Sequence, residues 1–166
     1  MEDKDIINYV KRQIEDWVVG DIHRAIEGGS KVGAFILTAC AIDYLASFWS
    51  GTASNARKYK AFVADFFDEH YEPEDLYRSL RCGLVHNYTI KGSAYLLVDA
   101  KPELHFQKAD GVTILNLEDF AEDFRKAKDA YFERLDMDPT LQHNLARRYK
   151  RVGILGLIQL ESGMGG

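Results

Sequence analysis

What the sequence lacks limits its chemistry. The 166 residues contain two cysteines and three prolines. There is no CxxC, no HExxH and no His/Cys cluster at ligand spacing, so no structural metal is expected. A Gly-rich phosphate loop, a G-x-S-x-G elbow, internal repeats and strong βαβ alternation are missing too, which argues against a Rossmann-type enzyme. We therefore expect no metal and no cofactor.

Composition and charge indicate one folded, soluble domain spanning residues 1–166. The chain is 46% hydrophobic and 28% charged, and its length is enough to bury a core without disulfides or metal. A formal net charge of −5 argues against a protein that coats nucleic acid through bulk electrostatics. Any RNA contact must then be local. The two cysteines and the absence of a signal peptide at the start predict a cytoplasmic location.

Hydrophobic periodicity predicts a mainly α bundle of four to six helices. Residues 31–50 are apolar nearly all round, so this helix should lie at the centre. A membrane span is the competing interpretation, and Asp43 near the middle of the helix argues against it, so we expect no membrane contact. The other expected helices cover residues 5–27 and begin near Ser54 or Asn55, at Pro73, after an Asn116 cap, and at Pro139.

A small antiparallel β insertion is predicted at about residues 94–115. The runs 95–99, 103–108 and 112–115 are rich in β-prone residues, and Asp110-Gly111 is a strong hairpin turn signal. The insertion directly follows the segment whose residues most suggest catalysis. It could therefore form one side of a cleft or cover a dimer interface.

That segment is 80–91, which contains Arg81 and His86. A guanidinium suits phosphate charge, and an imidazole moves protons near neutral pH. Together they could support phosphodiester cleavage by a neighbouring 2′-hydroxyl without a metal. Five residues on an α-helix amount to a rotation of about 140°, so we expect one chain not to bring the two side chains together, and two copies to do so. Gly83 leaves room for another backbone or a phosphate.

Several polar residues elsewhere are open to two interpretations. Asp43 needs a partner if it is buried, and Arg57, Arg81 or His86 could supply one. The result is either a structural salt bridge or a group that orients the motif. Arg57, Lys58 and Lys60 form either a solvated face or a phosphate track. The basic cluster 147–151 either complements a helix dipole or holds a nucleic-acid backbone. Cys40 should be a small core residue.

The run Arg81, four residues, His86, one residue, Tyr88 resembles the R-x4-6-H signature of the HEPN domain family, in its R-x4-H-x-Y form. The resemblance implies a HEPN-like helical bundle that works as a homodimer with the two motifs facing each other. Many members are metal-independent ribonucleases, which serve as toxins of toxin–antitoxin pairs, in abortive infection and in RNA processing. Cys82 stands where active members often carry a polar residue.

The resemblance also implies roles and partners. Arg81 and His86 would be catalytic, and Asn87 and Tyr88 would hold or tune the site. In some systems a nucleotidyltransferase partner silences the toxin by modifying the motif tyrosine, which is Tyr88 here. An antitoxin is the other implied partner. The alternative function is a non-catalytic helical dimerisation or nucleotide-binding module, in which Arg81 pairs with Asp43 and His86 is a satisfied core residue. A regulatory partner protein is a third option.

Overall fold

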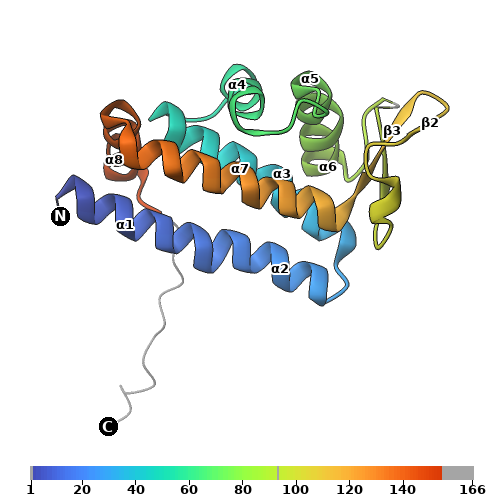
Figure 1. Cartoon of the computed structure of the whole chain (residues 1–166), viewed down its shortest axis with the longest axis horizontal. Coiled ribbons are helices and arrows are strands. Elements are labelled where there is room, and N and C mark those ends of the chain that lie inside the picture. The colour runs from blue at the N-terminus through green and yellow to red at the C-terminus, as the bar shows by residue number, and fades with distance from the viewer. Residues whose placement is uncertain (1, 93, 155–166) are drawn as a thin grey trace, which may run out of the picture.

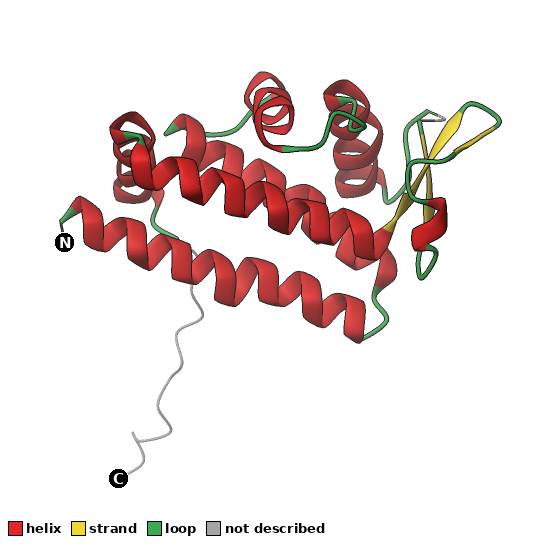
Figure 2. Ribbon diagram, viewed as in Figure 1, coloured by secondary structure: helices red, strands yellow, loops and turns green. Residues whose placement is uncertain are grey.

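The computed structural model describes residues 2–92 and 94–154 and shows a mainly helical protein with one small sheet (Figures 1 and 2). The predicted fold class, a helical bundle with a β insertion, is confirmed. The sheet lies at one end of the bundle, beyond α6 and the start of α7 (Figure 1), and Tyr95 and Leu115 join it to the hydrophobic core.

The N-terminal rod corresponds to the single helix predicted for residues 5–27. It consists of α1 (Asp3–Gln13), a π-helical stretch η1 (Ile14–Val19) and α2 (Gly20–Glu27), which follow one another without a break. One side is apolar and packs into the core, and Gly29 then turns the chain with a φ of 76°. The buried side chains of the rod are Ile6, Ile7, Val10, Ile14 and Ile22.

Helix α3 (Lys31–Ser50) lies at the centre, as predicted, and contacts α2, α4, α7 and α8. It is apolar nearly all round because it is covered on several sides, which is typical of a core helix. Among the described residues it is the one helix long and apolar enough to cross a membrane, and 56% of its most apolar window is buried inside the bundle. Gly51 ends it in a left-handed conformation.

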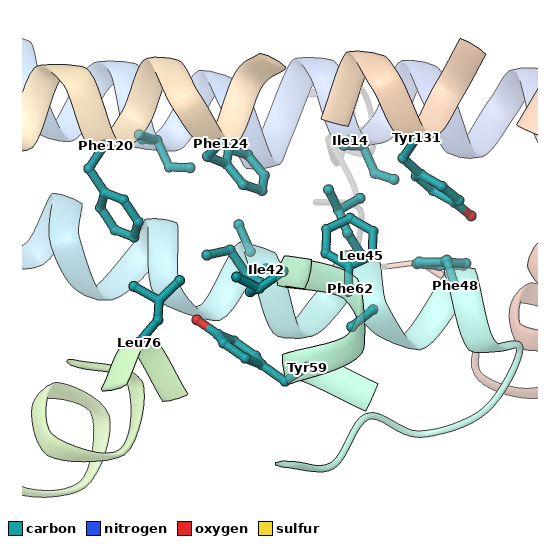
Figure 3. Close-up of a cluster of buried hydrophobic side chains, with 14 of the residues drawn as sticks. Ile14, Ile42, Leu45, Phe48, Tyr59, Phe62, Leu76, Phe120, Phe124 and Tyr131 are labelled. Carbon is teal, nitrogen blue, oxygen red and sulfur yellow. The ribbon is translucent and has the colours of Figure 1, made fainter. Parts of the chain in front are cut away.

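Three further helices enclose α3: α4 (Ala56–Phe66), α7 (Leu117–Met137) and α8 (Pro139–Val152). Side-chain caps start two of them. The Asn55 side chain accepts a hydrogen bond from the Lys58 N–H, and Asp138 accepts from two N–H groups in the first turn of α8. Figure 3 shows the resulting core, to which α3, α4 and α7 contribute Ile42, Leu45, Phe48, Tyr59, Phe62, Phe120, Phe124 and Tyr131.

Asn116 occupies the N-cap position of α7, as predicted, but its side chain makes no capping hydrogen bond. The Asn116 amide group donates to Asp119, and its oxygen accepts a hydrogen bond from the Lys101 N–H, so this buried side chain ties the strand end to the preceding loop. An asparagine before a helix can bond to several backbone groups, and here its oxygen bonds to the N–H of Lys101 in the β insertion instead of to the first turn of α7.

The β insertion holds β1 (Tyr95–Val98), β2 (Lys108–Ala109) and β3 (Val112–Asn116), in the spatial order β1-β3-β2. The prediction of an antiparallel ribbon is wrong in part. Strand β3 pairs antiparallel with β2 through the predicted hairpin, but parallel with β1. Most of the run 103–108 is not a strand, because Pro102–Leu104 forms a 3-10 turn (η3) that carries the chain back to give the parallel pairing, and β2 begins only at Lys108.

The basic C-terminal end of α8 binds the end of α3. Arg147 donates to the carbonyl oxygens of Ser50 and Gly51, and Arg148 donates to the Ser47 hydroxyl. These guanidinium groups bind carbonyl and hydroxyl oxygens at the C-terminal end of α3, where the helix dipole is negative. The basic residues therefore complement a helix dipole, and the helix is α3. The sequence of residues 154–160 is apolar and could form a packing strand or helix or an exposed tail, and from residue 155 onward this segment lies outside the described residues.

Candidate active site

A helical segment in three parts carries the motif. It begins as α5 (Pro73–Asp75), passes through a π-helical stretch η2 (Leu76–Arg81) and ends as α6 (Cys82–Asn87). Leu76, Leu80 and Leu84 are buried and fix this segment against α3 and α4. Short π-helical stretches occur frequently at functional sites, and this one ends at the motif arginine.

Gly83 is required by the chain that follows it. A Cβ at this position would lie 2.4 Å from the Thr89 carbonyl oxygen and 2.8 Å from the Lys91 nitrogen. The predicted close approach of a backbone is therefore confirmed, and the backbone is the chain's own loop. That loop is held down by hydrogen bonds from the Thr89 N–H to Gly83 and from the Lys91 N–H to Ser79.

Tyr88 ends the motif helix. It adopts a left-handed conformation with a φ of 53°, which is uncommon for a bulky residue, and its side chain is 69% exposed. The helix stops at Asn87, and the reversed φ turns the tyrosine into solvent. Asn87 is exposed beside it.

Asp43 is the partner of Arg81. The Nε and Nη2 atoms of Arg81 lie 2.8 Å and 2.6 Å from Asp43 Oδ2, and the two side chains are 22% and 18% exposed. Burial opposes the charged form of Arg81, but the charge of Asp43 and its hydrogen bond outweigh burial and raise the guanidinium pKa. Two of the three guanidinium nitrogens are thus fixed to the central helix.

The third nitrogen points at His86. Arg81 Nη1 lies 3.2 Å from His86 Nε2 within a single chain. The expectation that one chain keeps these side chains apart is wrong. The rotation of 140° describes where Cβ bonds point, whereas the guanidinium stands at the end of a long side chain that Asp43 holds in place. The predicted pair therefore exists without a second subunit.

The contact limits how the imidazole can bond. A guanidinium offers only donors, so a hydrogen bond across this contact requires His86 Nε2 as its acceptor. A neutral imidazole that accepts there would have its proton on Nδ1. An unprotonated Nε2 on an exposed residue is the form that a general base needs.

Sequence reasoning missed the role of Tyr77. The Arg81 guanidinium carbon stands 5.8 Å from the centre of the Tyr77 ring, which adds a cation–π contact to the salt bridge. Burial is the main cause that raises the pKa of Tyr77, and the neighbouring Cys82 raises it further. The spacing of four residues between Tyr77 and Arg81 is the signal that could have predicted this contact.

The two cysteines flank the site. Cys82 Sγ is 4.0 Å from Arg81 Nη1, and the thiol is half-buried. Cys40 is half-buried rather than a core residue, since it lines an apolar cavity of about 290 Å³ between η1 and α3. Burial raises the pKa of the Cys40 thiol. Among the described residues, no group of three or more His, Cys, Asp or Glu side chains is placed to hold a metal ion.

Comparison with known proteins gives no further assignment. No protein-family model, no curated protein and no solved structure matches this chain.

Proposed function

We propose that this chain is a metal-independent endoribonuclease of the HEPN type, which cleaves RNA by attack of a 2′-hydroxyl on the adjacent phosphate. The observation that carries the proposal is the 3.2 Å approach of Arg81 Nη1 to His86 Nε2, on an exposed helix end whose guanidinium Asp43 anchors. The site then combines a permanent cation and an imidazole nitrogen within the span of one phosphodiester group.

In this mechanism His86 Nε2 takes the proton of the 2′-hydroxyl as the 2′-oxygen bonds to phosphorus. The bond from phosphorus to the 5′-oxygen breaks, and that oxygen gains a proton from an imidazolium or from water. The products are a 2′,3′-cyclic phosphate and a 5′-hydroxyl. The incoming phosphate replaces His86 as the acceptor of the Arg81 Nη1 N–H group, which frees His86 Nε2 and stabilises the charge that develops on the phosphate oxygens.

Asp43 acts through Arg81 rather than on RNA. With Nε and Nη2 bound to one carboxylate oxygen, rotation of the guanidinium is restricted and Nη1 stays aimed at the site. Preorganised donors of this kind are more effective in catalysis than donors that must reorient. Asp43 therefore combines both roles considered from its sequence position, since it forms a salt bridge and orients the motif arginine.

Asn87 and Tyr88 border the open side of the site, and both are exposed. In the proposal they hold or tune the bound strand. The 69% exposure of Tyr88 also leaves its hydroxyl accessible to a partner nucleotidyltransferase, which would silence the enzyme by modification. An antitoxin would act at the same face. The protein would work in the cytoplasm, as part of a toxin or defence system.

A homodimer belongs to the proposal. Leu37 on α3 and Val85 on α6 are exposed hydrophobic residues, at 38% and 36%, on the two helices that carry Asp43 and the motif. Apolar side chains at such positions suit a contact between copies, with one Arg81–His86 pair from each chain. Light scattering of the pure protein checks this part. A monomer at micromolar concentration would contradict it while leaving the single-chain pair intact.

The test of the activity is incubation of pure protein with mixed cellular RNA in EDTA. The parent should generate fragments that end in 2′,3′-cyclic phosphate, and His86→Ala and Arg81→Ala should not. His23→Ala is the matched control, because His23 is an exposed histidine on α2 that pairs only with Glu27 among the described residues. Cleavage that persists in both motif variants would contradict the proposal.

One observation favours a second candidate function, a non-catalytic dimerisation or nucleotide-binding module. Two of the three guanidinium nitrogens of Arg81 bind Asp43 in the same chain, and this salt bridge compensates much of the arginine charge. A parent protein that binds nucleotides or dimerises but leaves tRNA, rRNA and mRNA intact would support this module instead.

A further inference from the structure

A second, basic pocket lies where α3 ends, away from the Arg81–His86 pair. It has a volume of about 540 Å³ and is lined by four helices, α3, α4, α7 and α8. Its lining residues are Trp49, Ser50, Arg57, Lys58, Ala61, Arg134, Leu141 and Asn144. None of these belongs to the proposed active site.

The charge of this pocket opposes that of the chain. Three of the lining side chains are cations and none is a carboxylate, in a protein of formal net charge −5. Arg57 is exposed and makes no ion pair or hydrogen bond with any described residue. Lys58 donates only to neutral oxygens, those of Thr52 and Ala53, and Arg134 has one ion pair with Asp65 at 3.5 Å. Two of the three charges therefore lack a counterion within the described chain.

Arg57 and Lys58 also occupy an unfavourable place in their helix. They lie in the first turn of α4, where the helix dipole is positive, and no acidic residue accompanies them there. Helices α1 and α7 instead place acids in the first turn. An anion bound in the pocket would compensate both the dipole and the two cations.

The pocket lining also includes an aromatic side chain that its neighbours hold in place. Trp49 is half-buried and meets the Phe62 ring edge-on at 6.2 Å. Its carbonyl accepts a hydrogen bond from the Asn144 amide at 3.0 Å, so α8 holds the end of α3 in position. Cations and an aromatic side chain that line one pocket are the elements that bind a phosphate and its base together.

We propose that this pocket binds a nucleotide, with its phosphate at Arg57, Lys58 and Arg134 and its base against Trp49. The ligand is either a free nucleotide or one unit of a single strand of RNA, since both present the same chemistry. The proposal does not depend on the proposed ribonuclease activity, because the two sites share no residue.

The test is calorimetric titration of the parent and of two matched variants with three probes. The probes are ADP, inorganic phosphate and a 2′-O-methyl RNA of about ten nucleotides, which spans a typical single-strand site and resists cleavage by 2′-hydroxyl attack. Arg57→Ala should weaken nucleotide or RNA binding about tenfold, since it removes a charge-assisted hydrogen bond. Lys60→Ala removes the same charge from the same helix, but Lys60 pairs with Glu74 and does not line the pocket, so binding should stay within about twofold.

Arg57 has no partner among the described residues, so the Arg57→Ala variant should keep the fold intact. Arg134→Ala is a second variant, which removes another cation of the pocket and should weaken binding independently. Tight binding of ADP alone would identify a free nucleotide as the ligand, and tight binding of the RNA alone would identify a strand. Three outcomes would overturn the proposal: no binding of any probe at millimolar concentration, equal weakening by Arg57→Ala and Lys60→Ala, or inorganic phosphate binding as tightly as ADP.

Discussion

Asp43, on the central helix, binds Arg81 through two nitrogens and leaves the third facing His86. This relationship links the fold to the proposed chemistry, because the carboxylate that would otherwise be a misplaced charge in an apolar helix determines where the guanidinium points. It also makes the site sensitive to substitutions that never touch RNA.

Asp43→Asn should destabilise the protein by about 1–3 kcal/mol, because it leaves the half-buried Arg81 without a compensating charge. Urea unfolding measures the change. Asp21→Asn is the control, since Asp21 pairs with Arg24 at the surface with both side chains more than half exposed, and it should cost no more than about 0.5 kcal/mol. Equal losses in the two variants would show that burial of the Asp43 pair has no energetic consequence.

Gly83→Ala should destabilise the protein by about 1–3 kcal/mol, because the new Cβ would collide with the backbone of residues 89–91. The loop must move, so amide exchange should quicken at Lys91, whose N–H bonds to Ser79. Gly20→Ala is the matched control. There the closest atom, at 3.0 Å, belongs to the flexible end of Arg24, and alanine should be neutral or stabilising in this helical position. A neutral Gly83→Ala would contradict the close approach.

Tyr59→Phe should leave stability unchanged or raise it. The Tyr59 hydroxyl is fully buried, and it finds no hydrogen-bond partner among the described residues. Burial also raises its pKa well above the usual value of 10.0. Tyr71→Phe is the comparison, because the Tyr71 hydroxyl donates to Asp123 at 2.9 Å, and its loss should cost about 1 kcal/mol. Thermal unfolding of the two variants measures both changes in stability. A larger loss of stability for Tyr59→Phe than for Tyr71→Phe would mean that the Tyr59 hydroxyl has a hydrogen-bond partner.

Asp123 should make the protein lose stability in acid. Burial favours the neutral carboxyl, but hydrogen bonds from His105, Lys126 and Tyr71 outweigh burial and lower the pKa below its usual value of 3.8. A lowered pKa in the folded state gives stability that is present above the unfolded value and is lost as pH falls through the folded one. Unfolding measured from about pH 5 downward should show this loss in the parent. Asp123→Asn should flatten the dependence, and an unchanged slope would contradict the assignment.

The sequence predicts the helices well because their apolar periods are long and their ends carry strong signals. The 31–50 helix, the Asn55 cap and the turn at Pro139 are each specified locally. The β insertion is predicted less well. The predicted runs 95–99 and 112–115 match β1 and β3 to within one residue. The parallel pairing of β1 with β3, however, depends on the path of the chain through η3, which residue types do not encode.

Part of the candidate site could likewise be predicted from the sequence, and part could not. The partnership of Asp43 with Arg81 could be anticipated, since a carboxylate inside an apolar helix needs a cation. The meeting of Arg81 and His86 in one chain could not, because helix periodicity gives the direction of a Cβ and not the end point of a long side chain. The exposure of Tyr88 depends on its positive φ, which no local residue preference predicts for a tyrosine.

The most direct measurement of the central claim is the initial rate of RNA cleavage in EDTA by the parent, His86→Ala and His23→Ala at equal concentrations. Loss of a general base typically reduces a rate by about 10²–10⁴-fold, so His86→Ala should fall by that factor while His23→Ala keeps the parental rate. Equal rates for the parent and His86→Ala would contradict the assignment of this imidazole as the proton carrier.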